Sequence, residues 1–393
     1  MAASTLPPLR ICHVITSLGV GGLERVVLDL AAAQRKAGHE VSVAVLNDGK
    51  GPLAEAFRAA AGELVAFPKR GAGVDASLVG RLARWLRSRR VQVVHTHNNL
   101  PLIYGAPAGK LAGAIVVHSK HGEHLATGRR LWLRRLAATA ADAYVAVSPT
   151  TAAVAREHRE CPEAKLTVIA NGTDLSRFPA PAEAAAAARA SIGVGPEARL
   201  IGTVGRMVPE KNHALFLRAL APLLGPSLKL VLVGDGQLRS ELEAQRSALA
   251  NQEHVIFSGM RRDVPDLLAA FDVFVLSSAT EGLPVVLLEA MASKLPVVST
   301  AVGGIPDVVP EGAGVLVPPH DEAALRGAVE ALLDDAARAR AMGERARAEA
   351  LETMSVERMA EAYAALYGRV LRRRKGGAAA RASVSPAPSA PLP

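Results

Sequence analysis

Cysteine, aromatic residues and long apolar runs are all scarce in this chain of 393 residues. Its two cysteines, Cys12 and Cys161, are too few for a disulfide framework and lack the spacing of a metal site. No apolar run reaches the roughly 18 residues of a transmembrane helix. Residues 1–10 contain no apolar segment before a small-residue cleavage site, so we expect no signal peptide. These absences favour a cytoplasmic protein over a secreted or membrane-spanning one.

Charge is abundant but unevenly distributed. The net charge of +9 divides into +10 for residues 1–178, −6 for residues 179–371 and +5 for residues 372–393. A basic first half predicts an anionic partner for that half, whereas a generally arginine-rich composition is the alternative. Half of the residues are hydrophobic, and the length predicts two or three domains with sizeable cores.

Short apolar segments alternate with helical patterns along both halves of the chain, which predicts two α/β domains with parallel sheets. We expect a first domain over residues 1–178 and a second over 179–355, joined by an Ala/Pro/Gly-rich linker near 175–197. A helix over 356–371 and a disordered tail over 372–393 complete the prediction. The expected strands are 11–15, 40–46, 91–95, 114–118 and 143–147, then 200–204, 229–233, 255–258, 273–276, 296–300 and 314–317.

The segment E-G-L-P-V-V-L-L-E holds two carboxylates, Glu281 and Glu289, eight residues apart. This spacing is a little over two helical turns, so both side chains can lie on roughly one side of a helix. Gly282, Leu283 and Pro284 suit a loop that enters a helix, whose free N–H groups can hold an anion. The pattern fits a nucleotide-sugar, with hydroxyl groups at both ends of its phosphates, although two solvated glutamates are the alternative.

Two further loops follow predicted strands and carry candidate phosphate ligands. Gly205 and Arg206 end the apolar run 200–204, and Lys211 follows five residues after the arginine. Arginine offers a planar fork to phosphate oxygens and lysine a point charge. In the first half, Gly21 and Gly22 belong to a glycine-rich loop after the first strand, where backbone can approach a ligand closely.

These motifs, taken in order, resemble the family 4 retaining glycosyltransferases of the GT-B fold. The resemblance spans residues 10–370 and is closest to members that assemble surface polysaccharides. The matching segments are G-G-L-E at 21–24, H-T-H at 95–97, H-G at 121–122, V-S at 147–148, N-G-T-D at 171–174, G-R-x4-K at 205–211, L-V-G-D-G at 232–236, E-x7-E at 281–289 and G-G-I-P at 303–306.

The resemblance implies a fold of two Rossmann-like doubly wound domains facing a central cleft, with the last helix crossing back to the first domain. It also implies transfer of a sugar from a nucleotide-diphosphate sugar to a glycan or lipid-linked acceptor, with the anomeric configuration retained and no metal or other cofactor. Nucleic acid is not an expected partner.

The same resemblance gives each candidate site residue a role. Arg206 and Lys211 would stabilise negative charge on the leaving diphosphate. Glu281 would contact hydroxyls of the donor sugar, Glu289 the ribose, and the backbone of Gly282 and Leu283 the phosphate or sugar. Gly21 and Gly22 would approach the diphosphate from the first domain.

A histidine is expected near the transferred sugar. His121, which is followed by glycine, is favoured over His118 for this position. His95 and His97 alternate at a strand end, and we expect them to point to opposite faces, so that at most one faces the cleft. Asn171 is expected to have a mainly structural role in a turn. Asp307 stands where the family often has glutamate, and we do not rank it as catalytic.

Other protein classes share parts of this pattern. A dinucleotide-dependent oxidoreductase would need glycine where Glu24 stands. A nucleotide-sugar epimerase also has two similar domains and would need no acceptor. A two-lobed sugar-binding protein of the periplasmic type would need a signal peptide.

The segment R-R-L-W-L-R-R-L at 129–136 alternates pairs of arginines with apolar residues. As a helix it is basic and amphipathic, with Trp132 available for a membrane interface. We therefore expect peripheral contact with an anionic leaflet, at the inner face of the cytoplasmic membrane. A packed helix with solvated arginines is the alternative.

Overall fold

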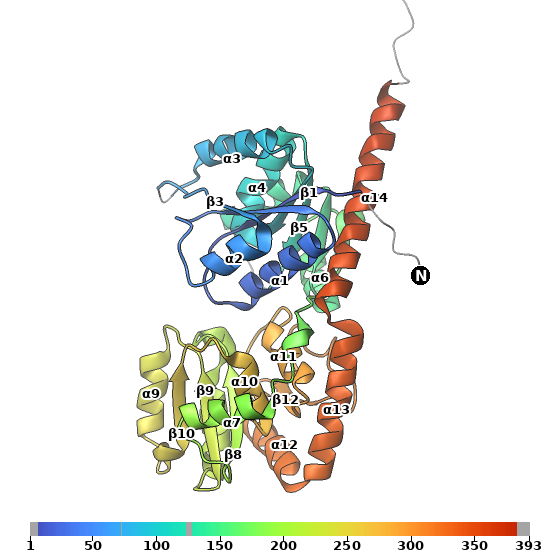
Figure 1. The fold of residues 1–393 in the computed structure, drawn as a ribbon. Coiled ribbons are helices and arrows are strands. Elements are labelled where there is room, and N and C mark those ends of the chain that lie inside the picture. Colours follow the sequence, from blue (N-terminus) through green and yellow to red (C-terminus); the bar gives the residue numbers. More distant parts are fainter. Residues whose placement is uncertain (1–6, 72, 123–127, 383–393) are drawn as a thin grey trace, which may run out of the picture.

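The computed structural model describes residues 7–71, 73–122 and 128–382, without the side chains of residues 129, 130 and 376–382. The chain forms two lobes, each built around one parallel sheet (Figure 1). The first sheet has seven strands in the order β3-β2-β1-β4-β5-β6-β7, and the second has six in the order β10-β9-β8-β11-β12-β13. In chain order the strands are Arg10–Ile15, Glu40–Val45, Glu63–Ala66, Val93–His97, Ile115–Lys120, Ala143–Ala146 and Leu166–Val168, then Arg199–Val204, Leu228–Val233, Val255–Gly259, Val273–Leu276, Val297–Thr300 and Val315–Val317.

Helices connect the strands and cover both faces of each sheet (Figure 1). The fold class expected from sequence, two Rossmann-like α/β domains, is therefore confirmed. Helices α1 to α7 are Gly22–Lys36, Ala54–Ala61, Ala76–Ser88, Asn99–Ala112, Gly128–Thr139, Pro149–Glu157 and Ala182–Ser191. Helices α8 to α14 are His213–Leu220, Arg239–Ser247, Val264–Ala270, Val285–Ala292, Glu322–Asp334, Ala336–Thr353 and Val356–Ala382.

The central strands are almost entirely buried because helices cover them on both sides. β1, for example, is buried from Ile11 to Ile15. Polar residues mark where several helices begin: Asp75 accepts a hydrogen bond from the Leu78 N–H, and Ser148 does the same for Thr151. Each such cap stabilises its helix by about 1 kcal/mol.

The segment between the domains differs from the expected linker. Most of residues 175–197 belongs to the second domain, because α7 lies there and packs through Ala188 into that domain's core. Arg189 fixes this helix by donating hydrogen bonds to the carbonyl oxygens of Ala270 and Ala198.

The last helix crosses back to the first domain, where Tyr363 and Tyr367 are buried against the core next to β4 and β5 (Figure 1). The prediction of disorder from residue 372 onward is wrong for its first part, because α14 continues to Ala382. Arg374 lies in this extension and donates a hydrogen bond to the carbonyl oxygen of Gly113. Apart from Gly376 and Gly377, residues 372–382 are arginine, lysine and alanine, which are strong helix formers. Residues 383–393 lie outside the described part of the chain.

Each sheet reverses its strand order at one point, between β1 and β4 in the first domain and between β8 and β11 in the second. In open α/β sheets the carboxyl ends of the strands at such a point form the ligand-binding crevice. The loops that follow these four strands carry Gly21, Asn98, Lys211 and Glu281. The topology thus brings the predicted motifs of both halves to the seam between the domains.

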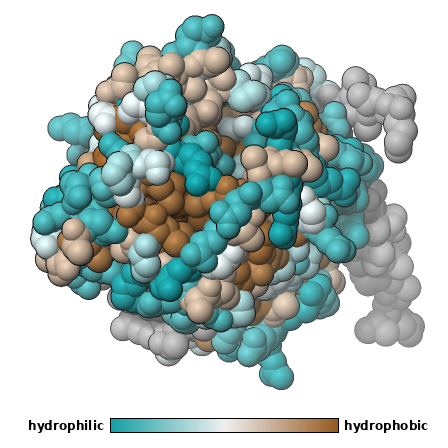
Figure 2. Space-filling model, turned by 90° about the horizontal axis from the view of Figure 1, so that it is seen from below, coloured by the Kyte–Doolittle hydropathy of each residue, from teal (hydrophilic) through white to brown (hydrophobic). Residues whose placement is uncertain are grey.

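The surface alternates polar and apolar areas. Seen from below, hydrophobic residues lie in the middle of the face and hydrophilic residues around them (Figure 2). Among the described residues, no helix combines the length and the apolar character needed to span a bilayer.

Candidate active site

Glu281 and Lys211 form an ion pair at the edge of the second domain. Lys211 ends the short turn after β8, and Glu281 lies in the loop between β11 and α11. Lys211 Nζ is 2.5 Å from Glu281 Oε1, and the Ser278 hydroxyl donates to the same oxygen at 2.6 Å. The pair is partly buried, with 18% and 10% of the side chains exposed. A cation and a carboxylate are thus held together just before the N-terminus of α11, where helix N–H groups favour an anion.

Gly282 joins this loop to the first domain. A Cβ atom at position 282 would lie 2.1 Å from the carbonyl oxygen of His121, so only glycine allows this approach. A second such contact lies nearby, where a Cβ on Gly304 would lie 2.6 Å from the Ser148 Cβ. Gly304 also donates its N–H to the Gly282 carbonyl oxygen at 2.7 Å. The two domains therefore meet through backbone at this part of the seam.

His121 follows β5 and faces this contact from the first domain. Its N–H donates to Asn98 Oδ1 at 2.9 Å, and its Nε2 lies 3.0 Å from His97 Nδ1. Burial lowers the pKa of His121 to about 4, which keeps the imidazole neutral near pH 7. The competing candidate, His118, lies inside the first-domain core, with its ring 4.7 Å from that of Tyr144.

The glycine-rich loop of the first domain reaches the same seam. Gly21 is the N-cap of α1, and a Cβ on Gly22 would lie 3.5 Å from Val285 at the start of α11. The Glu24 carboxylate folds back over the loop, where it accepts a hydrogen bond from the Ser17 hydroxyl at 3.0 Å. The N-termini of α1 and α11 therefore lie close together at the seam.

Glu289 lies in the second turn of α11. Burial raises the pKa of Glu289 to about 7, with Arg25 opposing the shift and Asp29 adding to it. Both of those residues belong to α1 of the first domain and form an ion pair with each other at 3.4 Å. Glu289 therefore faces the first domain across the seam and is charged only in part near neutral pH.

Leu283 and Asn171 add a further contact between the domains. The Asn171 amide donates from Nδ2 to the Leu283 carbonyl oxygen at 3.2 Å. Asp307 also bridges the domains, because its carboxylate accepts hydrogen bonds from the N–H and the hydroxyl of Thr150. The sequence predicts only a structural turn for Asn171, because its link to the active-site loop depends on how the two domains are arranged.

Arg206 is the predicted site residue that the structure does not bring into contact with the others. It is exposed after β8, and no hydrogen bond or ion pair of its side chain occurs within the described residues. It lies in the same loop as Lys211 and remains available to a ligand.

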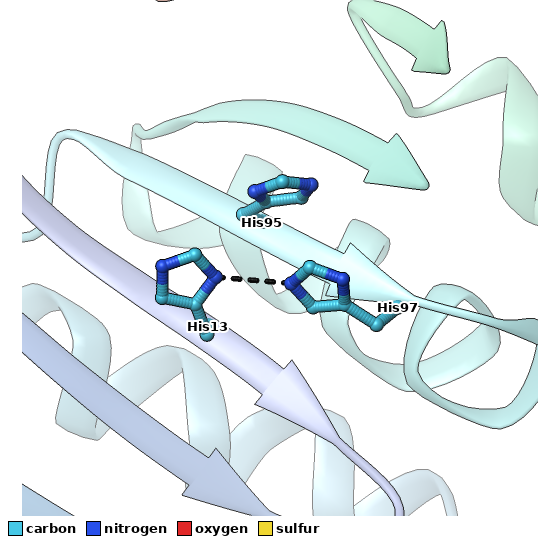
Figure 3. Close-up of side chains that lie close together, drawn as sticks. All are labelled: His13, His95 and His97. Carbon is cyan, nitrogen blue, oxygen red and sulfur yellow. Dashed lines mark hydrogen bonds between the residues drawn. The ribbon is translucent and has the colours of Figure 1, made fainter. Parts of the chain in front are cut away.

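The expectation that His95 and His97 point to opposite faces is wrong. Residues two apart on a strand share a face, because side chains alternate with a period of two. The two imidazole centroids lie 4.1 Å apart, and His13 of the neighbouring strand β1 lies 5.2 Å from each. All three rings are fully buried beneath the seam (Figure 3).

The basic segment at 129–136 also requires a correction. Arg134 is buried and pairs with Glu160, with Arg134 Nη2 2.6 Å from Glu160 Oε1, so it does not face a membrane. Arg135 is exposed but donates hydrogen bonds to the carbonyl oxygen of His158. Trp132 and Leu136 are the exposed apolar residues of α5, at 60% and 53%. The side chains of Arg129 and Arg130 lie outside the described part of the structure.

Among the described residues, one group has the spacing of a metal site: His13, His95 and His97, with ligand nitrogens within 4.8 Å of one another. Their ring nitrogens all have hydrogen-bond partners within the protein. His13 bonds to Gln34 and His97. His97 also bonds to His121, and the two nitrogens of His95 bond to the hydroxyls of Ser119 and Tyr367. A metal ion at this group would have to replace these hydrogen bonds.

Comparisons with known proteins find similarity to glycosyltransferases in both sequence and fold. A model of glycosyltransferase family 4 matches residues 20–177, and a model of glycosyl transferases group 1 matches residues 185–349. The putative glycosyltransferase EpsF of Bacillus subtilis (strain 168) is 30% identical over 298 residues, which cover 73% of this chain and 78% of EpsF. The UDP-Gal:alpha-D-GlcNAc-diphosphoundecaprenol alpha-1,3-galactosyltransferase of Escherichia coli is 29% identical over 236 residues, which cover 57% of this chain and 61% of the relative. The crystal structure of Anabaena HepE in complex with UDP and glucose has a TM-score of 0.82 and 23% identity and covers 92% of this chain and 99% of its own.

Two parallel-sheet domains that meet at their switch points define the GT-B class of glycosyltransferases. Within that class, the chain belongs to glycosyltransferase family 4. It is a nucleotide-sugar-dependent, retaining glycosyltransferase, as the motifs predict. The alternatives of an epimerase and of a sugar-binding protein receive no support from these comparisons.

Proposed function

We propose that the seam binds a nucleotide-diphosphate sugar, without a metal ion, and transfers its sugar to a glycan or lipid-linked acceptor during assembly of a cell-surface polysaccharide or glycolipid. The observation that carries this proposal is the Lys211–Glu281 ion pair, which precedes the N-terminus of α11 and lies across the Gly282 contact from His121. The loops after β8 and β11 thus offer three groups to a donor: a cation, a carboxylate that can bind hydroxyls, and a helix N-terminus.

These groups define how the donor is oriented in the proposed site. The diphosphate lies at the start of α11, near Lys211 and Arg206, where positive charge stabilises the negative charge that grows on the leaving phosphate. Glu281 accepts hydrogen bonds from hydroxyls of the transferred sugar, and Glu289 accepts them from the ribose. Gly22 and His121 close over the donor from the first domain.

The charges at the seam support metal independence. Metal-dependent transferases use a divalent cation to neutralise the diphosphate, held by carboxylates at a strand end. Here the carboxylate nearest the proposed diphosphate, Glu281, is already paired with Lys211. With Arg206 in the same loop, these residues keep a net positive charge near the proposed diphosphate, which supports compensation by the protein itself.

The proposed acceptor is lipid-linked, and the enzyme works at the inner face of the cytoplasmic membrane. The name of the Escherichia coli relative specifies an acceptor linked to diphosphoundecaprenol. The first domain carries a charge of +10 over residues 1–178, and α5 exposes Trp132 and Leu136 on its surface. Basic domains with exposed aromatic and aliphatic side chains bind anionic leaflets.

A thermal-shift panel tests the donor site directly. UDP, GDP and ADP and their common sugars are compared in the presence of excess EDTA. A ligand at 100 times its Kd stabilises the folded protein by about 2.7 kcal/mol. We expect one nucleotide series to raise the Tm, and Lys211→Ala to abolish the shift when it is measured from that variant's own unliganded Tm. Absence of a shift for all nucleotides, or a shift that requires Mg²⁺ or Mn²⁺, would contradict the proposal.

A further inference from the structure

A continuous chain of hydrogen bonds connects the interior of the first domain to His121 at the seam. It begins at Gln34 on α1, whose Oε1 lies 2.8 Å from His13 Nε2. His13 Nδ1 then lies 3.0 Å from His97 Nε2, and His97 Nδ1 lies 3.0 Å from His121 Nε2. Figure 3 shows the bond between His13 and His97, which lie on the neighbouring strands β1 and β4.

All members of this chain are electrically neutral near pH 7. Burial lowers the pKa of His13 and of His121 to about 4, and it lowers the pKa of His97 well below its ordinary value. A neutral imidazole has one N–H donor and one acceptor nitrogen. The direction of one hydrogen bond therefore determines the direction of the next along the whole chain.

Gln34 sets this direction. Its Nε2 donates to the Tyr367 hydroxyl at 3.3 Å, which leaves Oε1 to accept from His13 Nε2. His13 Nδ1 is then an acceptor and takes the proton of His97 Nε2–H. In the same way His97 Nδ1 accepts from His121 Nε2–H. The remaining nitrogen of His121, Nδ1, is left with a lone pair.

That lone pair lies at the seam beside a second unsatisfied acceptor. The Asn171 side chain faces the His121 ring and raises the pKa of the imidazole against the larger, opposite effect of burial, but within the described part of the chain neither His121 Nδ1 nor Asn171 Oδ1 completes a hydrogen bond of normal geometry. Asn171 is held in place by its bond from Nδ2 to Leu283 of the active-site loop. Two acceptors left unpaired in a buried position are costly, and a hydroxyl proton donated to each of them would remove that cost.

We propose that Gln34, His13 and His97 are positioning residues that hold His121 as its Nε2–H tautomer, so that His121 Nδ1 and Asn171 Oδ1 accept hydrogen bonds from hydroxyl groups of the bound sugar. This inference rests on the proposed function of the seam. It assigns a role to the histidines beneath the site, and it uses the ring nitrogens that a metal ion would otherwise need.

The tautomers are measurable without any substrate. Long-range proton–nitrogen correlation spectra of protein labelled with ¹⁵N-histidine distinguish Nδ1–H from Nε2–H. We expect His13, His97 and His121 to be Nε2–H in the wild type, each assigned by a His→Gln variant. In Gln34→Met, which has similar volume and no polar end, we expect His13 and His121 to show mixed tautomers. An Nδ1–H tautomer at His121 in the wild type would overturn the inference, as would a divalent metal ion bound to His13, His95 and His97 in the purified protein.

Kinetics separate positioning from mere support of the fold. We expect Gln34→Met to lower kcat by about tenfold, the loss of one well-placed hydrogen bond. The Kd for the nucleoside diphosphate should not change, because that group binds to the second domain. Tyr104→Phe is the matched control, because its buried hydroxyl accepts a hydrogen bond from the Asp75 N–H and is not part of the chain that leads to His121. We expect this control to leave kcat unchanged.

A double-mutant comparison completes the test. If Gln34 acts through His121, adding Gln34→Met to His121→Ala should cause no further loss of kcat. An equal tenfold loss in both backgrounds, or unchanged kcat in Gln34→Met, would overturn the inference. A wild-type protein that binds no nucleotide-sugar would instead refute the proposed function, and the tautomer spectra would still report on the hydrogen-bond chain.

Discussion

A Cβ atom on Gly282 would lie 2.1 Å from the carbonyl oxygen of His121, so backbone from the two domains meets at this point. Neither partner is a flexible side-chain end that can move aside. We expect Gly282→Ala to separate the domains locally and to lower kcat at least a hundredfold, since small misplacements at an active site have effects of about this size. Circular dichroism should remain native.

The matched control for that substitution is Gly80→Ala. Gly80 lies inside α3, and an added Cβ would have no atom within 4 Å. Alanine there should leave activity unchanged and stabilise the helix by up to about 1 kcal/mol. Wild-type activity in Gly282→Ala would show that the contact between the domains is not part of the working enzyme.

Removing the positive charge of the diphosphate site should affect turnover strongly. We expect Lys211→Ala and Arg206→Ala each to lower kcat by around 10²–10³, the effect of losing one charge-stabilising donor. Lys294→Ala is the control, because Lys294 also forms an ion pair in the second domain, 2.9 Å from Glu344, but on the exposed surface. Steady-state kinetics with a saturating donor checks this prediction, and equal activity of all three variants would remove both residues from the site.

Glu289 should show a trade-off between stability and binding. Its pKa is raised from 4.5 to about 7 in the folded protein, so the native state holds more protons than the unfolded state between these values. This carboxyl group therefore destabilises the fold increasingly as pH rises through that window, by up to about 3 kcal/mol above it. Glu289→Gln should raise the Tm at pH 8 and leave it unchanged at pH 4.5.

The same substitution should weaken binding of the nucleoside diphosphate, by about 1.5–3 kcal/mol for a lost charged hydrogen-bond partner. Calorimetric titration at pH 8 measures this loss. Unchanged affinity would refute the ribose assignment, and a Tm difference that does not depend on pH would refute the role of burial.

Membrane contact should depend on the apolar residues of α5. We expect Trp132→Ser with Leu136→Ser to reduce flotation with anionic vesicles, and we expect binding to weaken with salt because charge attraction is screened. Leu351→Ser is the control, because this residue of the second domain is comparably exposed, at 48%. Arg134→Ser is not a suitable test, because it would break a buried ion pair. Equal flotation of the wild type with neutral and anionic lipid would contradict the proposal.

Much of the fold could be predicted from the sequence, because buried parallel strands consist of apolar runs that stand out between helices. Two strands were missed, β3 at Glu63–Ala66 and β7 at Leu166–Val168. Both lie at the edges of the first sheet, are short, and are only partly buried, so they have neither a long apolar run nor clear alternation. The C-terminal extension of α14 was missed because residues 372–382 have no apolar periodicity, although most of them have high helix propensity.

The candidate site could be predicted as a set of loops but not as a set of contacts. Lys211 and Glu281 are 70 residues apart, and their pairing follows from the adjacency of β8 and β11, which is a property of the sheet order. Arg134 appeared to be a surface charge because its buried partner, Glu160, lies on another element. The shared face of His95 and His97 could have been found from the strand period alone.

The most direct measurement of the central claim is turnover of the matching nucleotide-sugar in excess EDTA, followed by proton NMR with a lipid-linked acceptor. The account predicts that nucleoside diphosphate and glycoside form together, that the anomeric configuration of the donor is retained, and that EDTA does not change the rate. Loss of activity with EDTA that Mg²⁺ or Mn²⁺ restores, or an inverted product, would contradict it.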